Sequence, residues 1–281
     1  MKKILSVLLA LSMACSLAAC AGGSSSSEAS SEATSEAVSS EATATEEEAV
    51  PAEQDAPQLD AVASGEVMNY DQYMAADLDT EVTIQAYVQA KQSWWEDKAT
   101  VYLQDQDGGY FAYDMACSEE DYEKLTEGTC IRVTGYKTEW SGEVEIMDGT
   151  FEFVDGADTF VSMPLDVTEL LGTDELIYSQ NQRVAFKGLT VAPSTVEGSD
   201  EEYAFLYNWD GSGEDGDDLY FNVSYNGETY TFTVESYLCD NTTEVYNAVK
   251  NLQIGQTIDA EGFLYWYEGV NPHITSVTVT G

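Results

Sequence analysis

Basic residues are the scarcest class in this sequence. Among 281 residues there are 10 Lys and Arg against 52 Asp and Glu, and the formal net charge is −42. Two of the basic residues, Lys2 and Lys3, lie at the extreme N-terminus. A field of this sign repels nucleic acids, teichoic-type polymers and anionic lipid head groups. We therefore expect a soluble, monomeric folded part for which a nucleic-acid partner is disfavoured.

Catalytic signatures are also missing. The single histidine, His273, has no nucleophile beside it, and the sequence contains no C-x-x-C, H-E-x-x-H or phosphate-loop pattern. Glu143 and Glu145 fall on one face of a predicted strand and have the residue types of a glycosidase dyad, but chance carboxylate pairs are frequent in so acidic a chain. We expect no enzyme and no cofactor. An accessory hydrolase is the alternative if these two carboxylates line a deep cleft.

The first residues combine a basic start with a short apolar run. The run is too short to span and anchor, which predicts a signal peptide over residues 1–19. It ends in Leu17-Ala18-Ala19-Cys20-Ala21-Gly22, which resembles the lipobox of bacterial lipoproteins. The resemblance implies cleavage before Cys20, diacylglycerol on its sulfur, and a lipoprotein anchored to the cell membrane on its extracytoplasmic side. An ordinary secretory signal that leaves a free Cys20 is the alternative.

Residues 20–64 are dominated by Ser, Ala, Glu and Thr. This stretch has no Lys or Arg and almost no large apolar side chains. Such a composition cannot bury enough surface to offset the entropy lost on ordering. It predicts a disordered tether that holds the folded part away from the membrane.

Two distant stretches share one sequence frame, which predicts an internal duplication. One constant offset relates six pairs of residues: Leu125 and Leu252, Gly128 and Gly255, Ile131 and Ile258, Gly135 and Gly262, Trp140 and Tyr267, and Gly142 and Gly269. The first stretch alternates apolar and polar residues, as a half-buried strand does, and Trp140-Ser141-Gly142 predicts a turn.

Each copy of the frame lies in a region with the same order of predicted elements. In residues 65–157 we predict a short helix at 68–78, strands at 81–92, 100–103 and 110–113, a helix at 118–125, and two strands around the turn at 140–142. In residues 158–281 we predict a short helix at 166–171, strands at 183–191, 203–207, 219–223 and 229–234, a helix at 242–252, and again two strands.

Three strands, a helix and two strands is the order of an OB-fold, which each region resembles along its whole length. The resemblance implies an all-β protein with short helices, made of two tandem OB-fold-like five-stranded barrels, the second with an inserted hairpin. A single large β-sandwich is the alternative.

Three cysteines follow the leader. Cys117 and Cys130 flank a predicted helix, and an extracytoplasmic site permits a disulfide if their Cα atoms come within about 7 Å. We expect free, partly buried thiols instead, with Cys239 single in either case.

The acidic loop at 208–218 partly matches a calcium-binding loop. Oxygen donors at Asn208, Asp210 and Ser212, followed by Gly213, match the first half of an EF-hand loop. The candidate calcium ligands are Asp210, Ser212, Glu214 and Asp217. Leu219 stands where the bidentate glutamate belongs. A solvated hairpin tip is the expected state, and a calcium site is the alternative.

Aromatic residues give the strongest binding signal. OB-folds bind ligands with the loops that join strands one to two and four to five. In the first region these loops carry Trp94, Trp95 and Trp140, surrounded by Lys91, Lys98 and Lys137. We predict that they form a rim that binds a glycan or an extended peptide by stacking. An anionic polymer such as nucleic acid on the Lys/Trp rim, or tryptophans that only pack, are the alternatives.

If Cys20 carries the lipid, a Cys20→Ala variant loses its anchor. We expect this variant to appear in the culture medium, while the parent partitions with the membrane fraction. Retention of the variant in membranes at the parental level would contradict the lipoprotein prediction.

Overall fold

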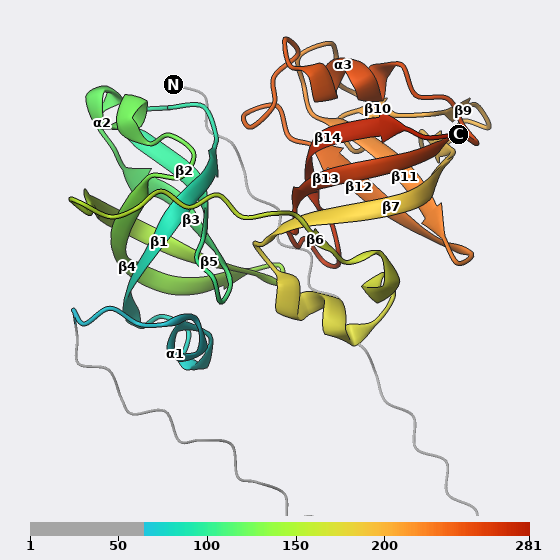
Figure 1. Cartoon of the computed structure of the whole chain (residues 1–281). Helices are drawn as coiled ribbons and strands as arrows, with labels where there is room; N and C mark the ends of the chain where they lie inside the picture. The colour runs from blue at the N-terminus through green and yellow to red at the C-terminus, as the bar shows by residue number, and fades with distance from the viewer. Residues whose placement is uncertain (1–64) are drawn as a thin grey trace, which may run out of the picture. The chain divides into compact units, whose positions relative to one another are not determined.

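The computed structural model describes residues 65–281, which form two closed β-barrels (Figure 1). The predicted signal peptide, Cys20 and the tether lie outside these residues. No helix within residues 65–281 has the length and apolar content needed to cross a membrane.

The first barrel has five strands that close in the order β1-β2-β3-β5-β4. β4 pairs back with β1, and β3 meets β5 in parallel. Figure 1 shows two short helices at opposite ends of this barrel. The elements are α1 (Tyr70–Ala75), β1 (Glu81–Lys91), β2 (Lys98–Gln104), β3 (Gly109–Ala116), α2 (Glu119–Lys124), β4 (Cys130–Trp140) and β5 (Glu143–Phe153).

The second barrel repeats this order. Its ring runs β7-β11-β12-β14-β13, and β13 pairs back to β7. Along the chain, α3 lies between β12 and β13. The ring elements are β7 (Arg183–Ala192), β11 (Leu219–Tyr225), β12 (Glu228–Val234), α3 (Glu244–Lys250), β13 (Thr257–Phe263) and β14 (His273–Val279). Before it lie β6 (Leu165–Asp166), η1 (Thr168–Leu170) and η2 (Asp174–Ser179). The predicted fold class of two OB-fold barrels is thus confirmed.

An insertion separates the first and second strands of the second barrel. Its strands have two residues each: β8 (Ser194–Thr195) and β9 (Glu202–Tyr203) form the inserted hairpin, and β10 (Leu206–Tyr207) pairs with β11. The prediction that residues 203–207 are strand two is therefore wrong. The aromatic residues there suit a strand, but the second ring position is taken by β11, whose full length pairs with β12.

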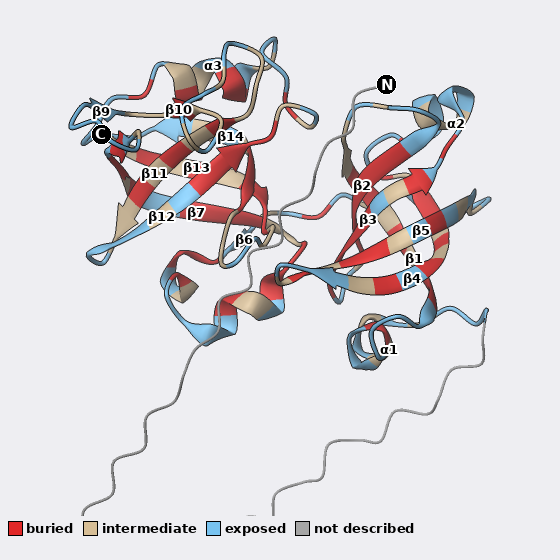
Figure 2. Cartoon of the chain, turned by 180° about the vertical axis from the view of Figure 1, so that it is seen from behind, coloured by how far each residue is buried: buried red, intermediate tan, exposed pale blue. Residues whose placement is uncertain are grey.

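Alternating side chains fill the two barrels. Figure 2 shows buried residues along the strands and exposed ones at the turns. Inward residues such as Ile84 and Val133 form the first core, and Phe186 and Phe232 belong to the second. Each barrel therefore has its own apolar interior, as two separate OB-folds require.

The duplicated glycines occupy equivalent places. A methyl group at Gly135 would lie 2.7 Å from the Met147 carbonyl oxygen, and one at Gly262 would lie 2.2 Å from that of His273. In both barrels the strand-four register shifts at this point. Only glycine allows the backbones to approach this closely at the bulge.

A third apolar cluster joins the two barrels. Tyr102 of β2 and Phe111 of β3 point outward from the first barrel, yet they are 0% and 2% exposed, because Phe263 of the second barrel covers them. The rings of Tyr102 and Phe263 stack at 4.3 Å between centroids with 12° between planes. A 2.8 Å hydrogen bond joins Tyr102 Oη and His273 Nδ1. We call this contact the junction.

Gly262→Ala should lower the free energy of unfolding by about 1–3 kcal/mol or more, since its methyl group overlaps backbone rather than a movable side chain. Thermal or urea unfolding measures the change. Thr278→Ala, at an exposed position of β14, serves as the control and should have little effect. Equal stability of the two variants would contradict the close approach.

Candidate functional site

A groove of about 1040 Å³ opens on the second barrel. Six aromatic side chains contribute to it, with hydroxyl and amide groups between them. The lining residues are Trp140, Pro193, Ser194, Thr195, Leu206, Trp209, Tyr220, Asn222, Thr229, Tyr230, Thr231, Tyr265, Tyr267, Glu268, Gly269, Val270, Asn271 and His273. We call this site the aromatic groove.

The aromatic groove lies where OB-folds bind ligands. Tyr220 and Asn222 of β11, with Thr231 of β12, alternate with the core residues Phe221 and Phe232 and so point outward. One wall is the loop between β13 and β14, and the other is the insertion between β7 and β11. Strands two and three with these two loops are the usual ligand face of the fold.

The second barrel has this groove because its last hairpin opens early. In the first barrel β4 and β5 stay paired up to Trp140 and Glu143 at the turn. In the second, the continuous pairing of β13 with β14 stops at Phe263 and His273. Pro272, which has no N–H to donate, precedes β14. The loop at 264–272 bonds to β12 at Thr233, through Asn271 and Pro272, and its earlier residues border the groove.

Three of the lining rings are well exposed. Trp209 is 76%, Trp140 53% and Tyr267 46% exposed. Trp140 and Tyr267 hold equivalent positions of the duplicated frame, and their rings lie 5.0 Å apart. Large exposed aromatic side chains gathered in one hollow are typical of a binding surface.

Uncharged polar groups accompany the rings. Asn222 Oδ1 accepts from Thr231 Oγ1 at 2.8 Å, and Asn271 Oδ1 accepts from Thr233 Oγ1 at 2.8 Å. Asn222 Nδ2 also donates to the Pro193 carbonyl oxygen at 3.0 Å, so these bonds fix the amide and leave it one N–H for a ligand. Burial lowers the pKa of His273 to about 3, so it is neutral. Glu268 is the one acidic side chain among the lining residues.

No basic side chain is left for an anionic ligand in the described part of the chain. Six of the eight Lys and Arg residues there form ion pairs with carboxylates. The other two, Lys91 and Lys137, donate to backbone carbonyl oxygens. No lysine or arginine lines the aromatic groove.

The tryptophans predicted to form one rim are divided by the structure. Trp140 joins the aromatic groove, but neither Trp94 nor Trp95 lines it. Trp94 Nε1 donates to the Cys117 carbonyl oxygen at 2.9 Å. Trp95 lies at the β1–β2 turn and is 65% exposed.

The three lysines are not free to surround these rings. Lys98 pairs with Asp114 at 2.8 Å, and Lys91 lies 3.7 Å from the centroid of the Tyr122 ring. Lys137 is only 5% exposed, so its predicted place on a rim is wrong. Its ammonium donates at 2.8 Å to the carbonyl oxygens of Met74 and Ala76, which the end of α1 leaves unpaired.

Glu143 and Glu145 do not line the aromatic groove. They are 0% and 7% exposed and lie against the junction. Trp266 N and Gln180 Nε2 donate to Glu143 Oε2 at 2.9 and 3.2 Å. The condition under which the sequence favours a hydrolase, two carboxylates in a deep cleft, is therefore not met.

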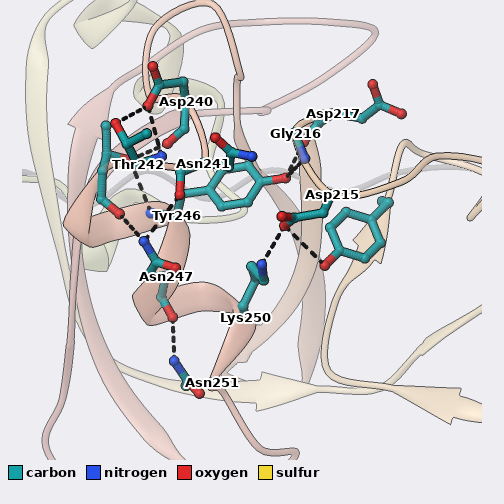
Figure 3. A network of polar contacts seen from close by, with 12 residues as sticks. Asp215, Gly216, Asp217, Asp240, Asn241, Thr242, Tyr246, Asn247, Lys250 and Asn251 are labelled. Atoms are coloured by element: carbon teal, nitrogen blue, oxygen red, sulfur yellow. Dashed lines mark hydrogen bonds and ion pairs between the residues drawn. The ribbon is translucent and has the colours of Figure 1, made fainter.

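The acidic loop is held by contacts of its own (Figure 3). Lys250 of α3 pairs with Asp215, and Tyr246 Oη accepts from Gly216 N and donates to the Asp217 carbonyl oxygen. Asp210 Oδ1 accepts from Ser212 N, and Asp217 Oδ2 accepts from Glu214 N. Within residues 65–281 no three His, Cys, Asp or Glu side chains are placed to hold a metal ion. The calcium alternative thus has no preformed site.

The three cysteines Cys117, Cys130 and Cys239 are buried and free, as expected from the sequence.

Several lining residues were not selected from the sequence. Trp209 lies in the acidic loop, whose carboxylates suggest a calcium site. Tyr220, Tyr230 and Tyr265 have the pattern of ordinary strand or loop residues. Their shared position depends on the insertion folding beside β11. The signal that could have found them is Trp209 itself, a large apolar side chain in a highly polar loop.

Comparisons with known proteins give a weak structural likeness and no sequence match. No protein-family profile matches the chain, and no curated protein is similar to it in sequence. Among solved structures, it is similar to a murine DNA-binding protein bound to double-stranded DNA (9% identity, 71% of this chain and 96% of that one, TM-score 0.35). It is also similar to the p204 HINb domain (11% identity, 73% and 100%, TM-score 0.32).

A replication protein A heterotrimer bound to single-stranded DNA is a third similar structure (14% identity, TM-score 0.29). The match covers 72% of this chain and only 49% of that one, so the chain spans about half its length. At these TM-scores the fold assignment rests on the strand order described above. The similar structures include DNA-binding domains, and that is a property of those proteins.

Because Lys137 caps α1, Lys137→Met should destabilise the protein. Two part-buried carbonyl oxygens lose their donor, and a fully buried one would cost about 1–3 kcal/mol. Urea unfolding measures the loss, and Lys98→Met, at an exposed ion pair, should cost less than about 1 kcal/mol. An unchanged unfolding midpoint for Lys137→Met would show that the ammonium is not structural.

Proposed function

We propose that this chain is a binding module that holds a neutral glycan in the aromatic groove of its second barrel. The observation that carries the proposal is one groove with six aromatic side chains and no lysine or arginine among its lining residues. Aromatic faces stack on the apolar faces of sugar rings, while amides and hydroxyls bond to sugar hydroxyls. The predicted lipid on Cys20 and the tether would present this module at the outer surface of a membrane.

A glycan suits the floor of the aromatic groove better than an extended peptide does. Extended peptides bind by adding a strand to a free sheet edge. The floor of the aromatic groove is the outer face of β11 and β12, where Tyr220, Asn222 and Thr231 present side chains rather than backbone. The stretch of β12 before Thr233 is unpaired toward β14, and it offers only a short edge to a peptide.

Nucleic acid is the second candidate. OB-folds stack bases on aromatic residues, and the similar solved structures include proteins bound to DNA. Against it, binding to phosphates draws on Lys and Arg, and all eight of these residues in the described part are engaged elsewhere. Salt separates the two candidates, since phosphate binding weakens steeply with salt and sugar binding does not.

The test is affinity electrophoresis of the full chain in gels that contain neutral polysaccharides, followed by titration calorimetry with hexasaccharides of the glycan that retards it. Trp209→Ala and Tyr267→Ala should each weaken binding about 10- to 100-fold, because each removes about 1.5–3 kcal/mol of aromatic burial. Melting temperatures should change little, since both rings are exposed.

Trp95→Ala is the matched control, since Trp95 is equally exposed but lies outside the aromatic groove. Loss of binding in this variant, with Trp209→Ala unaffected, would move the site to the β1–β2 loop of the first barrel. Binding of a dT15 oligonucleotide that falls steeply between 50 and 200 mM salt, without any glycan binding, would replace glycan by nucleic acid.

A further inference from the structure

Three buried glutamates surround the junction of the two barrels. Glu143 and Glu145 lie on β5, and Glu235 follows β12; they are 0%, 7% and 9% exposed. All three lie near Tyr265. Burial raises the pKa of this phenol, and the charges of the three glutamates raise it further. Each barrel thus contributes a carboxyl group to one buried cluster, which we call the acid cluster.

No cation offsets the acid cluster among the described residues that face it. The charged neighbour of Glu145 is Asp114, and that of Glu235 is Asp218. Lys98 is paired with Asp114 and its side chain is 47% exposed. The ionisable groups that face the cluster are Tyr70 and Tyr73 of α1, Lys98 and Tyr102 of β2, Tyr113 and Asp114 of β3, Asp218 before β11, Tyr220 of β11, Cys239 after β12, Tyr265, and His273 of β14.

Glu143 Oε2 and Glu235 Oε1 each accept from a backbone N–H, but the other carboxyl oxygen of each residue has no donor. Glu143 Oε1 and Asn181 Oδ1 are both buried acceptors without a donor. Burial raises the pKa of Glu143, and this effect outweighs the nearby Asn181 side chain and Trp266 N–H, which lower it. Glu235 Oε2 is a third buried acceptor without a donor. A proton on Glu143 would bond to the Asn181 oxygen. The closed junction is therefore complete when its carboxyl groups are neutral.

The junction covers a surface that the second barrel leaves open. Tyr102 and Phe111 lie on the outer face of the second and third strands of the first barrel. The corresponding face of the second barrel is the floor of the aromatic groove. Phe263, Tyr265 and His273 thus lie over the position that a ligand takes on an OB-fold.

We propose that the junction is a pH-dependent joint, in which rising pH ionises the acid cluster, loosens the contact between the barrels, and uncovers the outer face of the first barrel at Tyr102 and Phe111. The second barrel is then a ligand mimic that occupies this face at low pH. The joint does not depend on which ligand the aromatic groove holds.

The direction follows from burial. It raises the pKa of Glu145 and Glu235 to about 7, compared with about 4.3 for a free glutamate. Below about pH 4.3 these groups are protonated whether the joint is closed or open, so pH has no effect. Between about pH 4.3 and pH 7 the glutamates of the open form release their protons first. The closed form therefore loses stability relative to the open form as the pH rises. Above about 7 the loss is complete.

Hydroxyl-radical footprinting of the full chain at pH 5.5 and 8.5 tests the joint, since it reads the exposure of individual aromatic side chains. We expect oxidation of Tyr102, Phe111 and Phe263 to rise severalfold at the higher pH. The core residues Phe221 and Phe232 should stay protected at both. Equal protection of the junction rings at both pH values would overturn the proposal, as would loss of core protection, which indicates global unfolding.

Paired variants separate the acid cluster from the general charge of the protein. Glu145→Gln with Glu235→Gln should keep the junction rings protected at both pH values. Glu139→Gln with Glu228→Gln makes the same change of charge at exposed positions and should keep the parental response. A response that persists in the first pair, or disappears in the second, would show that the acid cluster is not its cause.

Discussion

The stack of Tyr102 on Phe263 is the contact on which the rest of the described structure depends. Both rings belong to outer faces of their barrels, where a solitary OB-fold would present them to water. Covering them satisfies the hydrophobic effect only while the barrels stay together. The contact also fixes Trp140 of the first barrel beside Tyr267 of the second, and so completes the wall of the aromatic groove.

The shortage of basic residues connects the aromatic groove with the acid cluster. Because every lysine and arginine of the described residues is already engaged, the aromatic groove has no cation for a phosphate and the buried glutamates have no counter-ion. The same composition therefore favours a neutral ligand at one site and neutral carboxyl groups at the other. Tyr265 and His273 line the aromatic groove and also face the acid cluster, so the groove lies next to the buried glutamates.

The two copies of the duplicated frame share buried positions but differ in the hairpin that follows. Gly135 and Gly262 hold the same close approach, and Ile131 and Ile258 are both fully buried. The difference arises beyond them, where one hairpin stays paired to its turn and the other opens before Pro272. A few residues of irregular loop thus distinguish a covered face from an open one.

The sequence by itself determined the strand order, the two barrels and the exposed aromatic signal at Trp140, because alternation and turn residues act over short distances. It did not place strand two of the second barrel, since short aromatic segments suit both strands and insertions. Only the tertiary structure decided that Lys137 is buried, that Trp209 and Tyr267 share one groove, and that Glu143 is enclosed. Those outcomes depend on contacts between residues far apart in the sequence, such as Lys137 with Met74 and Ala76 and Glu143 with Trp266. Such contacts leave no local pattern in the sequence.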